Sequence, residues 1–408
     1  MDELTRTGTQ GSPMPKLAVL AFSGGLDTSF CVLYLKEQGY DVATVTVNTG
    51  GFSPAELARI EAQSPKLGAV KHVTVDARAD LFQGYLRYLV YGNVLRGQMY
   101  PLSVSAERVC QARAVAELAK ELGAAALAHG STGAGNDQVR FDVAFQALAP
   151  ELELLTPIRD LGLSRAGEMA FCAERGVVFP ERTKDYSINE GMWGTSVGGR
   201  ETLDPWTTLP EAAFPGGDIG SLPPTTLVLG FERGVPVSLD GEALDPVALV
   251  ARLNDLGRPY GIGRGVHLGD TILGIKGRVG FEAPAAHLLI GAHRELEKLV
   301  LSGKQLFWKE SLGNLYGSLL HEGHFFDPLA RDLEAFLESS QDRVSGEVRL
   351  TLHPRAFVIE GVQSPYSLMD PRIATYGEAN RLWTGAEAAG FAKLFGVQQV
   401  LTLKAKNN

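Results

Sequence analysis

Residues 17–29, LAVLAFSGGLDTS, join a short apolar run to a glycine-rich loop. The run at 17–22 is continuously apolar, which is typical of a strand buried on both faces of a parallel sheet. A helix is expected over residues 30–38, where Gly39 would end it. Residues 23–29 should therefore lie at the carboxyl end of the first strand, which is where open α/β sheets bind their ligands.

Strands and helices continue to alternate as far as about residue 160, which predicts a parallel α/β sheet. The pattern then changes to that of a second, α+β domain. Residues 204–224 carry five prolines and are expected to form an extended loop. Residues 385–403 are amphipathic and would either pack on another subunit or cover their own domain. The other expected strands are at 41–47, 71–75, 124–128, 225–231, 271–275, 346–352 and 356–359, and the other expected helices are at 79–91, 106–122, 164–175, 284–301 and 328–339, with one more starting at Ser53-Pro54.

The composition narrows the class of protein. The chain has 408 residues and a formal net charge of −9, so a general nucleic-acid or membrane-surface binder, which is normally basic, is not expected. Three cysteines without a C-x-x-C pair argue against a zinc site or a disulfide framework and fit the reducing cytoplasm. A polar N-terminus, and no apolar run near the roughly 18 residues of a membrane span, predict neither a signal peptide nor a membrane protein.

The loop at 23–29 is suited to binding an anion. Gly24 and Gly25 allow a tight turn and a close approach of a ligand to the backbone. The N–H groups beyond them open a helix whose positive end favours phosphate, and the hydroxyl side chains of the loop add further donors. The chain has no Gly-Lys-Ser/Thr sequence, so the lysine that holds a transferred γ-phosphate in a Walker A loop is absent. This favours a grip on the outer two phosphates as a unit, with attack at the α-phosphate. A plain strand–helix turn is the alternative.

A second polar cluster, HGSTGAGNDQVRF at residues 129–141, follows the expected fourth strand and should lie at the same edge of the sheet. Its three glycines again expose backbone. Arg140 could clamp a carboxylate with two parallel hydrogen bonds, and Asp137 could take an ammonium group. The set therefore suits a zwitterionic amino acid, and a polar surface loop is the alternative.

Two weaker signals point to no function. His321 and His324 do not have the spacing of a zinc-protease helix and are expected at the surface or in core packing. Residues 261–265, GIGRG, imitate a dinucleotide loop, but no buried strand precedes them, so a plain loop is expected.

The loop at 23–29 resembles the pyrophosphatase loop of ATP-splitting ligases. Together with the cluster at 129–141 it closely resembles the argininosuccinate synthase family, and the likeness runs from about residue 17 to the C-terminus. Further matches are YSINEGMWGTS at 186–196 and GIKGR at 274–278. The cluster is the more specific signal, because the loop also occurs in other ligases and in tRNA-modifying enzymes. A tRNA-thiolating role would need a basic surface and reactive cysteines, so it is not expected.

The resemblance implies an α/β fold: a parallel-sheet ATP-pyrophosphatase domain of the adenine nucleotide alpha hydrolase-like type, an α+β synthetase domain and a C-terminal helical arm. The boundaries would be a disordered tail at 1–15, the nucleotide-binding domain at 16–165, the synthetase domain for substrate binding and oligomerisation at 166–375, and the arm at 376–408. Members of the family are usually homotetramers whose C-terminal helices embrace neighbouring subunits.

The resemblance also implies a carbon–nitrogen ligase of arginine biosynthesis. Such an enzyme joins citrulline to L-aspartate through citrullyl-AMP and converts ATP to AMP and pyrophosphate. No covalent nucleophile is needed, and Mg²⁺ would accompany ATP without assigned side-chain ligands. Asp27 and Asp137 are candidates for supporting roles, and Asp27 is equally a helix-capping candidate. The positions that match the family's binding residues are, for ATP, Ala21, Phe22, Ser23, Gly24, Gly25, Leu26, Asp27, Thr28, Ser29, Val47 and Gly130; for aspartate, Thr132, Asn136 and Asp137; and for citrulline, Tyr100, Ser105, Asn136, Arg140, Ser187 and Ser196.

The chain departs from the family's pattern at the citrulline positions. Gly269 stands where the family has a citrulline-binding glutamate, Phe281 stands where it has a tyrosine, and the segment at 100–105, YPLSVS, also differs. Losing a carboxylate beside an ammonium group costs about 1.5–3 kcal/mol. Asp270 could replace it after a small loop shift, or the substrate lacks the ammonium, as an N-acylated citrulline does. The remaining alternatives are another ATP-pyrophosphatase amide or amidine ligase and a non-catalytic paralogue that binds ATP or amino acids.

Overall fold

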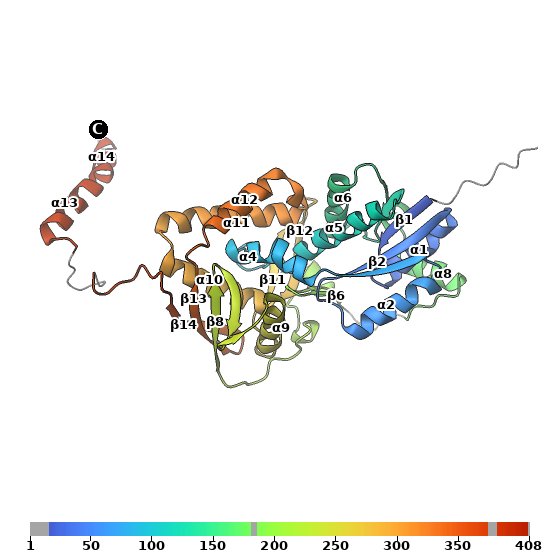
Figure 1. Ribbon diagram of the computed structural model, residues 1–408, viewed down its shortest axis with the longest axis horizontal. Coiled ribbons are helices and arrows are strands. Elements are labelled where there is room, and N and C mark those ends of the chain that lie inside the picture. The colour runs from blue at the N-terminus through green and yellow to red at the C-terminus, as the bar shows by residue number, and fades with distance from the viewer. Residues whose placement is uncertain (1–15, 181–185, 374–381, 407–408) are drawn as a thin grey trace, which may run out of the picture.

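The computed structural model describes residues 16–180, 186–373 and 382–406. The expected tail at 1–15 and the start of the expected arm at 376–381 lie outside the described residues. The described chain forms two lobes side by side, followed by a pair of helices that stands away from both (Figure 1). Three sheets organise the lobes, one in the N-terminal lobe and two in the C-terminal lobe.

The first lobe confirms the predicted parallel sheet. Its strand order is β3-β2-β1-β4-β5, and every neighbouring pair is parallel. Alternate residues of β1 face opposite sides: Leu20 packs with α1, and Val19 packs with α5. The strands are β1 (Lys16–Ala21), β2 (Tyr40–Asn48), β3 (Lys71–Asp76), β4 (Ala126–Ala128) and β5 (Glu153–Leu155), and the helices are α1 (Leu26–Glu37), α2 (Pro54–Lys66), α5 (Ser105–Glu121), α6 (Asn136–Leu148), α7 (Pro157–Leu161) and α8 (Arg165–Glu174).

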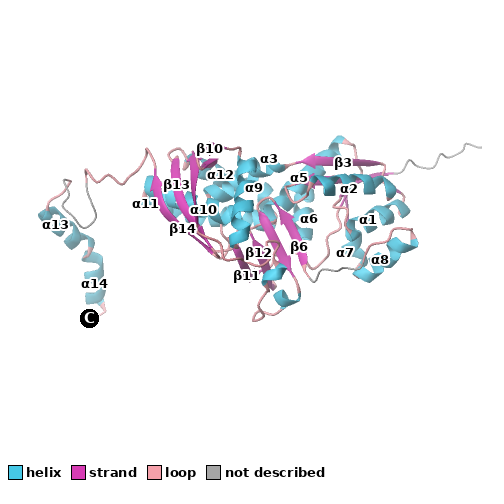
Figure 2. Ribbon diagram, turned by 90° about the horizontal axis from the view of Figure 1, so that it is seen from below, coloured by secondary structure: helices cyan, strands magenta, loops and turns pink. Residues whose placement is uncertain are grey.

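The second lobe holds two antiparallel sheets, of which the five-stranded one packs against α10 and α9 (Figure 2). The strand orders are β10-β9-β8-β13-β14 and β11-β12-β7-β6. The smaller sheet lies nearer the first lobe, so it can contribute to a site between the lobes. The strands are β6 (Ser187–Gly191), β7 (Gly194–Gly198), β8 (Thr225–Glu232), β9 (Val235–Leu239), β10 (Glu242–Ala243), β11 (Arg264–Asp270), β12 (Lys276–Glu282), β13 (Gly346–His353) and β14 (Ala356–Gln363), and the helices are α9 (Pro246–Gly257), α10 (Pro284–Val300), α11 (Gly303–Glu322) and α12 (Pro328–Ser339).

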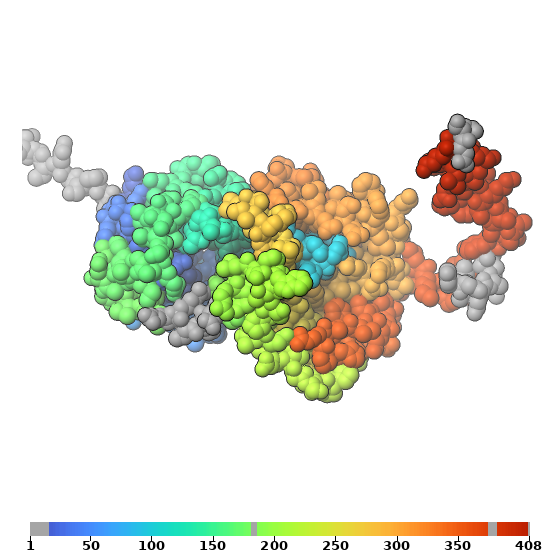
Figure 3. All heavy atoms as spheres, turned by 180° about the vertical axis from the view of Figure 1, so that it is seen from behind, coloured from blue at the N-terminus to red at the C-terminus, as the bar shows by residue number. Residues whose placement is uncertain are grey.

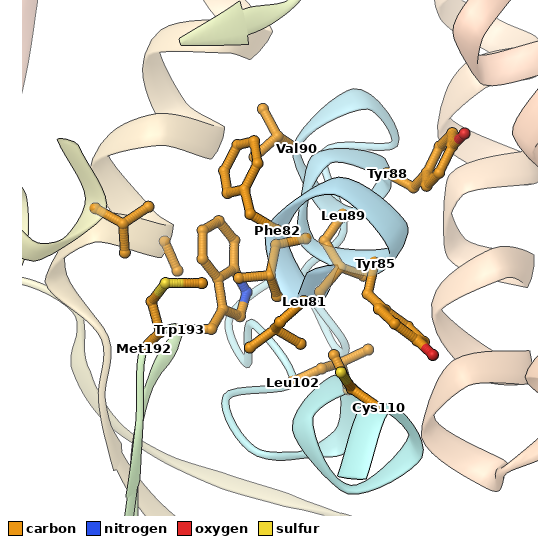
Figure 4. Packing of buried hydrophobic residues seen from close by; sticks show 14 of the residues in the cluster. Leu81, Phe82, Tyr85, Tyr88, Leu89, Val90, Leu102, Cys110, Met192 and Trp193 are labelled. Atoms are coloured by element: carbon orange, nitrogen blue, oxygen red, sulfur yellow. The ribbon is translucent and has the colours of Figure 1, made fainter. Parts of the chain in front are cut away.

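One continuous core joins the two lobes. Residues 78–91 form α3 (Arg78–Leu81), a π-helical turn (Phe82–Leu86) and α4 (Arg87–Tyr91). Figure 4 shows Trp193 and Met192, from the hairpin β6–β7, packed toward Phe82 of this segment. The buried Trp193 ring donates a hydrogen bond from Nε1 to the carbonyl of Pro101 at 2.9 Å. The hairpin is therefore anchored to the first lobe by both apolar packing and hydrogen bonding.

The C-terminal helices α13 (Gly385–Phe395) and α14 (Val397–Ala405) stand apart from the body in all three whole-molecule views (Figures 1, 2 and 3). None of their residues is buried, although Phe391, Phe395 and Leu401 are large apolar side chains. This agrees with the expected helical arm and leaves its apolar face uncovered within one chain. No helix in the described parts of the chain is long and apolar enough to cross a membrane.

Three local expectations need correction. The expected strand at 271–275 is the turn between β11 and β12, because Gly274 has a φ of +80° and its N–H bonds back to the carbonyl of Thr271. The expected loop at 261–265 contains the start of β11. The expected helix at 79–91 contains the π-helical turn. The long helix α11 was not expected at all.

Candidate active site

The glycine-rich loop lies between β1 and α1, as the sequence predicts. Gly24 has a φ of +68°, and a Cβ at this position would lie 2.9 Å from Cγ1 of Ile60, so the position requires glycine. Gly25 is the N-cap of α1 and provides no side-chain cap. The N–H groups of the first turn of α1 therefore remain available for an anion.

A cleft of about 830 Å³ opens over this loop. All of the predicted ATP positions line it except Gly24 and Ser29. Ser29 is buried instead, where its Oγ accepts a hydrogen bond from Gln63 at 3.1 Å. Val47 at the end of β2 and Gly130 just after β4 both reach the cleft, because the carboxyl ends of parallel strands meet at one edge of the sheet.

The cleft also contains residues that the sequence did not single out. Arg165 is exposed in the first turn of α8 and puts a cation at the cleft. Its position, shortly after the fifth parallel strand and on the same sheet edge, is a signal that could have identified it. The other lining residues outside the predicted set include Thr49, Phe52, Glu56, Arg108, Gln111, His129, Ile188, Asn189, Glu190 and Pro215.

The loop after β4 is held by a buried histidine. His129 donates from Nε2 to Asp142 at 2.7 Å, since its Nδ1 accepts the backbone N–H of Ser131 at 3.2 Å. The second oxygen of Asp142 accepts a hydrogen bond from Arg159 at 2.6 Å. Burial by itself would raise the pKa of Asp142, but the hydrogen bonds from His129 and Arg159 hold it below its ordinary value.

Asp137 holds two arginines side by side. Its Oδ2 lies 2.9 Å from Nε of Arg108, and its Oδ1 lies 2.8 Å from an amino group of Arg140. Burial would raise the pKa of Asp137, but the two guanidinium groups lower it, so the carboxylate is charged. The sequence suggested that Asp137 takes an ammonium and Arg140 a carboxylate. The structure pairs the two residues with each other and adds Arg108, which the sequence analysis missed.

Arg140 extends this cluster to a histidine from the second lobe. Its Nε donates to the carbonyl of His321 at 2.9 Å, and an amino group lies 3.2 Å from Nδ1 of the same histidine. Ser105 Oγ lies 3.1 Å from Nδ1 of His321. Burial and the charge of Arg140 lower the pKa of His321 to about 2, so the imidazole is neutral. His321 is buried, and it contacts both Ser105 and Arg140, two predicted citrulline positions. The spacing of the histidines in the sequence does not reveal this contact between the lobes.

The remaining predicted positions surround this cluster at different depths. Tyr100 is buried, and its hydroxyl accepts a hydrogen bond from Ser103 at 3.4 Å. Asn136 opens α6, and its Oδ1 accepts the N–H of Ile272 at 2.9 Å, which ties the β11–β12 turn to the first lobe. The hairpin β6–β7 carries an exposed Ser187 and a buried Ser196, and Thr132 is exposed in the loop before α6.

Two acidic side chains meet beside the phosphate-binding loop. Burial and the neighbouring carboxylate of Asp27 raise the pKa of Glu168 to about 7. Glu168 lies on α8, is buried, and its Oε2 has no hydrogen-bond partner within the described ranges. Glu168 therefore holds a proton near neutral pH, or gives it up to a cation that binds beside both side chains.

Comparison with known proteins agrees with this geometry. Residues 17–178 match the family described as arginosuccinate synthase N-terminal HUP domain, and residues 186–402 match the arginosuccinate synthase C-terminal domain. The argininosuccinate synthase of Methanocaldococcus jannaschii is 39% identical over 391 residues, which cover 95% of this chain and 98% of that protein. The argininosuccinate synthase of Xanthomonas campestris pv. campestris is 43% identical over 391 residues, which cover 94% of this chain and 97% of that protein. The chain therefore belongs to the argininosuccinate synthase family, whose members are ligases.

Proposed function

We propose that the protein joins citrulline, or a close ureido relative, to L-aspartate at the expense of ATP, with AMP and pyrophosphate as the other products. The observation that carries this proposal is the continuity of the cleft. One cavity runs from the uncapped N-terminus of α1 to the charged cluster around Asp137, whose Arg140 contacts the histidine beside Ser105. A phosphate site next to a polar acceptor site is what an adenylating ligase needs.

In the first step, the ureido oxygen of the acceptor attacks the α-phosphorus of ATP, and pyrophosphate leaves. A ureido oxygen is a poor leaving group, and adenylation replaces it with AMP, which leaves readily. The N–H groups at the start of α1 and the cation of Arg165 would stabilise the charge that develops on the departing pyrophosphate. The absence of a Walker lysine fits a reaction that leaves the β–γ bond intact.

In the second step, the amine of aspartate attacks the activated carbon, and AMP leaves. Arg108 and Arg140 lie on either side of Asp137 and form a pair of cations suited to substrate carboxylates. Asp137 would act by keeping both guanidinium groups in place, since both of its own oxygens are occupied. No covalent bond to the enzyme forms, so catalysis would rest on positioning and on charge stabilisation.

Mg²⁺ fits the acidic pair beside the loop. Asp27 and Glu168 would hold it, because oxygen ligands suit this cation and one oxygen of Glu168 has no partner in the described part of the chain. When bound, Mg²⁺ neutralises charge on the ATP phosphates. Glu168 would then release its proton.

We also propose a cytoplasmic homotetramer. Cys31, Cys110 and Cys172 are free thiols, as is usual in a reducing compartment. The uncovered apolar residues of α13 and α14 favour contacts with further copies of the chain. Sedimentation of the purified protein at several concentrations would measure the number of copies.

Pyrophosphate release tests the proposed activity. The complete mixture of ATP, Mg²⁺, citrulline or an acylated citrulline, and aspartate should give AMP and pyrophosphate, and omission of the acceptor should abolish both. Asp137→Asn should lower the rate about 10- to 150-fold, because charge-assisted contacts to two arginines are lost. Asp255→Asn, an exposed position on α9, is the matched control. If no complete mixture releases pyrophosphate, the proposed activity is wrong and a non-catalytic paralogue is the better explanation.

A further inference from the structure

An imidazole fills the place of the missing side chain at position 269. A Cβ on Gly269 would lie 2.5 Å from Nε2 of His267, two residues earlier on the same face of β11. The ring of His267 stacks on Tyr100, with centroids 5.3 Å apart and an angle of 18° between the planes. The imidazole of His267 can therefore occupy this place only because residue 269 has no side chain.

Tyr100 also contacts an apolar ring. The ring of Phe281 lies 5.4 Å from that of Tyr100 and stacks on His287 at 5.9 Å. Phe281 is buried, and burial lowers the pKa of His287 to about 4, so this ring is neutral. Tyr100 thus contacts one imidazole and one phenyl ring, and a second, neutral imidazole lies behind the phenyl ring.

The nearby charge is positive. Arg96 is half-buried, and its guanidinium forms no ion pair or hydrogen bond with any described residue. After burial, the charge of Arg96 is among the causes that lower the pKa of His267 and of His321. Nε2 of His321 is buried and has no hydrogen-bond partner among the described residues, and it carries the proton because Nδ1 accepts from Arg140. This end of the site therefore offers a cation and a free N–H donor.

The nearby carboxylates are already engaged. Asp270 forms an ion pair with Lys276 at 2.6 Å and lies on the opposite face of β11 from Gly269. Both oxygens of Asp137 are bonded to arginines. Asp270 thus does not replace the lost glutamate in this structure. Glu107, which also acts on Tyr100, is protonated at neutral pH because burial raises its pKa to about 8. A free ammonium group here would therefore meet the cation of Arg96 without a free carboxylate among the described residues.

A second cavity provides space beside Arg96. Its volume is about 290 Å³, and Arg96, Asn314 and Ser318 supply its polar lining. The space is sufficient for a short chain of atoms attached to a substrate bound at Ser105. Leu102 and Gly317 also line this cavity, and they lie three residues before Ser105 and one turn of α11 before His321, so the two regions adjoin.

We propose that the preferred acceptor is a citrulline whose α-amino group is acylated, with an acyl group that ends in a carboxylate and binds Arg96. This inference rests on the proposed function and narrows its substrate class. The amide nitrogen has no charge to be repelled, and the terminal carboxylate pairs with the guanidinium of Arg96, which forms no ion pair with a described residue.

Kinetics with three acceptors test the proposal: citrulline, its Nα-acetyl form and its Nα-succinyl form. The succinyl form should have the highest kcat/KM in pyrophosphate release, at least tenfold above citrulline. Arg96→Gln should reduce kcat/KM for the succinyl form about 10- to 150-fold and leave the acetyl form within a few-fold. Arg252→Gln, an exposed arginine on α9, is the control and should change neither.

Binding of the same acceptors in the presence of a non-hydrolysable ATP analogue tests the proposed acceptor class separately from the proposed ligase activity. Tightest binding of the succinyl form without any pyrophosphate release would refute the proposed function and support the acceptor class. Preference for citrulline in both assays would overturn the inference and leave the function intact. An Arg96→Gln variant that treats succinyl and acetyl forms as the wild type does would overturn the assignment of Arg96.

Discussion

Glu107 offers a direct test of how the hairpin β6–β7 is held against the nucleotide-binding lobe. Its side chain is 1% exposed on α5, and its Oε1 accepts the N–H of Trp193 at 3.3 Å. A Cβ on Gly191 would lie 2.1 Å from the same oxygen, so the hairpin backbone packs directly on this carboxyl group. Burial raises the pKa of Glu107 from its ordinary 4.5 to about 8.

The direction of the pH effect follows from this raised value. Between pH 4.5 and pH 8 the folded protein keeps a proton that the unfolded chain has lost. Stability falls with rising pH wherever the folded state binds more protons, so the free energy of unfolding decreases through this window. At 1.36 kcal/mol for each pKa unit, Glu107 removes about 3–4 kcal/mol of stability between pH 5 and pH 8.

Glu107→Gln removes this titration and keeps a carbonyl oxygen for the Trp193 N–H. In the wild type, Glu107 makes the free energy of unfolding about 3–4 kcal/mol lower at pH 8 than at pH 5, and in the variant this contribution should be absent. Urea unfolding followed by tryptophan fluorescence at both pH values measures it. Glu121→Gln, at the exposed end of the same helix, is the control. If Glu107→Gln shows the pH dependence of the wild type, the carboxyl group is ionised in the folded protein and the reasoning is wrong.

Three further predictions concern the cleft. Gly51→Ala puts a Cβ 2.0 Å from the carbonyl oxygen of Glu190, so it should cost about 1–3 kcal/mol and lower the melting temperature in a thermal scan. Arg165→Gln should raise KM for ATP about tenfold while leaving KM for the acceptor unchanged, since Arg165 lines the cleft together with the predicted ATP positions. Glu168 has a pKa of about 7, so the Mg²⁺ concentration for half-maximal binding, measured by calorimetry with ATP present, should fall from pH 6 to pH 8. Glu168→Gln should abolish that fall, and an unchanged fall would place the metal elsewhere.

The parallel sheet was predictable because its signals are local. The strands β1 and β4 are apolar runs that end in polar residues or glycine, β2 and β3 alternate valine with polar residues, and the phosphate-binding loop follows directly from β1. The edge at which ligands bind also follows from strand direction alone. This is why most predicted ATP positions line one cleft.

The errors arose where tertiary contacts override local preference. Ile272 and Ile275 suggest a strand, yet the hairpin reverses direction there through Gly274, whose left-handed conformation a side chain would oppose. In α11, Gly313 and Gly317 lower the helix propensity, but a Cβ on Gly313 would lie 2.3 Å from the carbonyl of Gly92. The glycines are there for close packing of the helix on the first lobe.

The acceptor end of the site was the least predictable part. His321 and Ser105 are separated by 216 positions in the sequence, and no spacing rule connects them. Arg96 and His267 were also not identified, because a single arginine or histidine outside a motif has no distinctive pattern. The departures at 269, at 281 and in the segment 100–105 gave a signal, but they indicated changed groups without revealing that His267 occupies the space beside Gly269.

The exposed C-terminal helices have a thermodynamic consequence. Helices of 11 and 9 residues are marginal in water on their own, and these two have no buried residue to support them. Their folding free energy must come from whatever surface covers Phe391, Phe395 and Leu401. The helical content of this segment should therefore rise with protein concentration, so that folding of the arm and association of the chains form a single equilibrium.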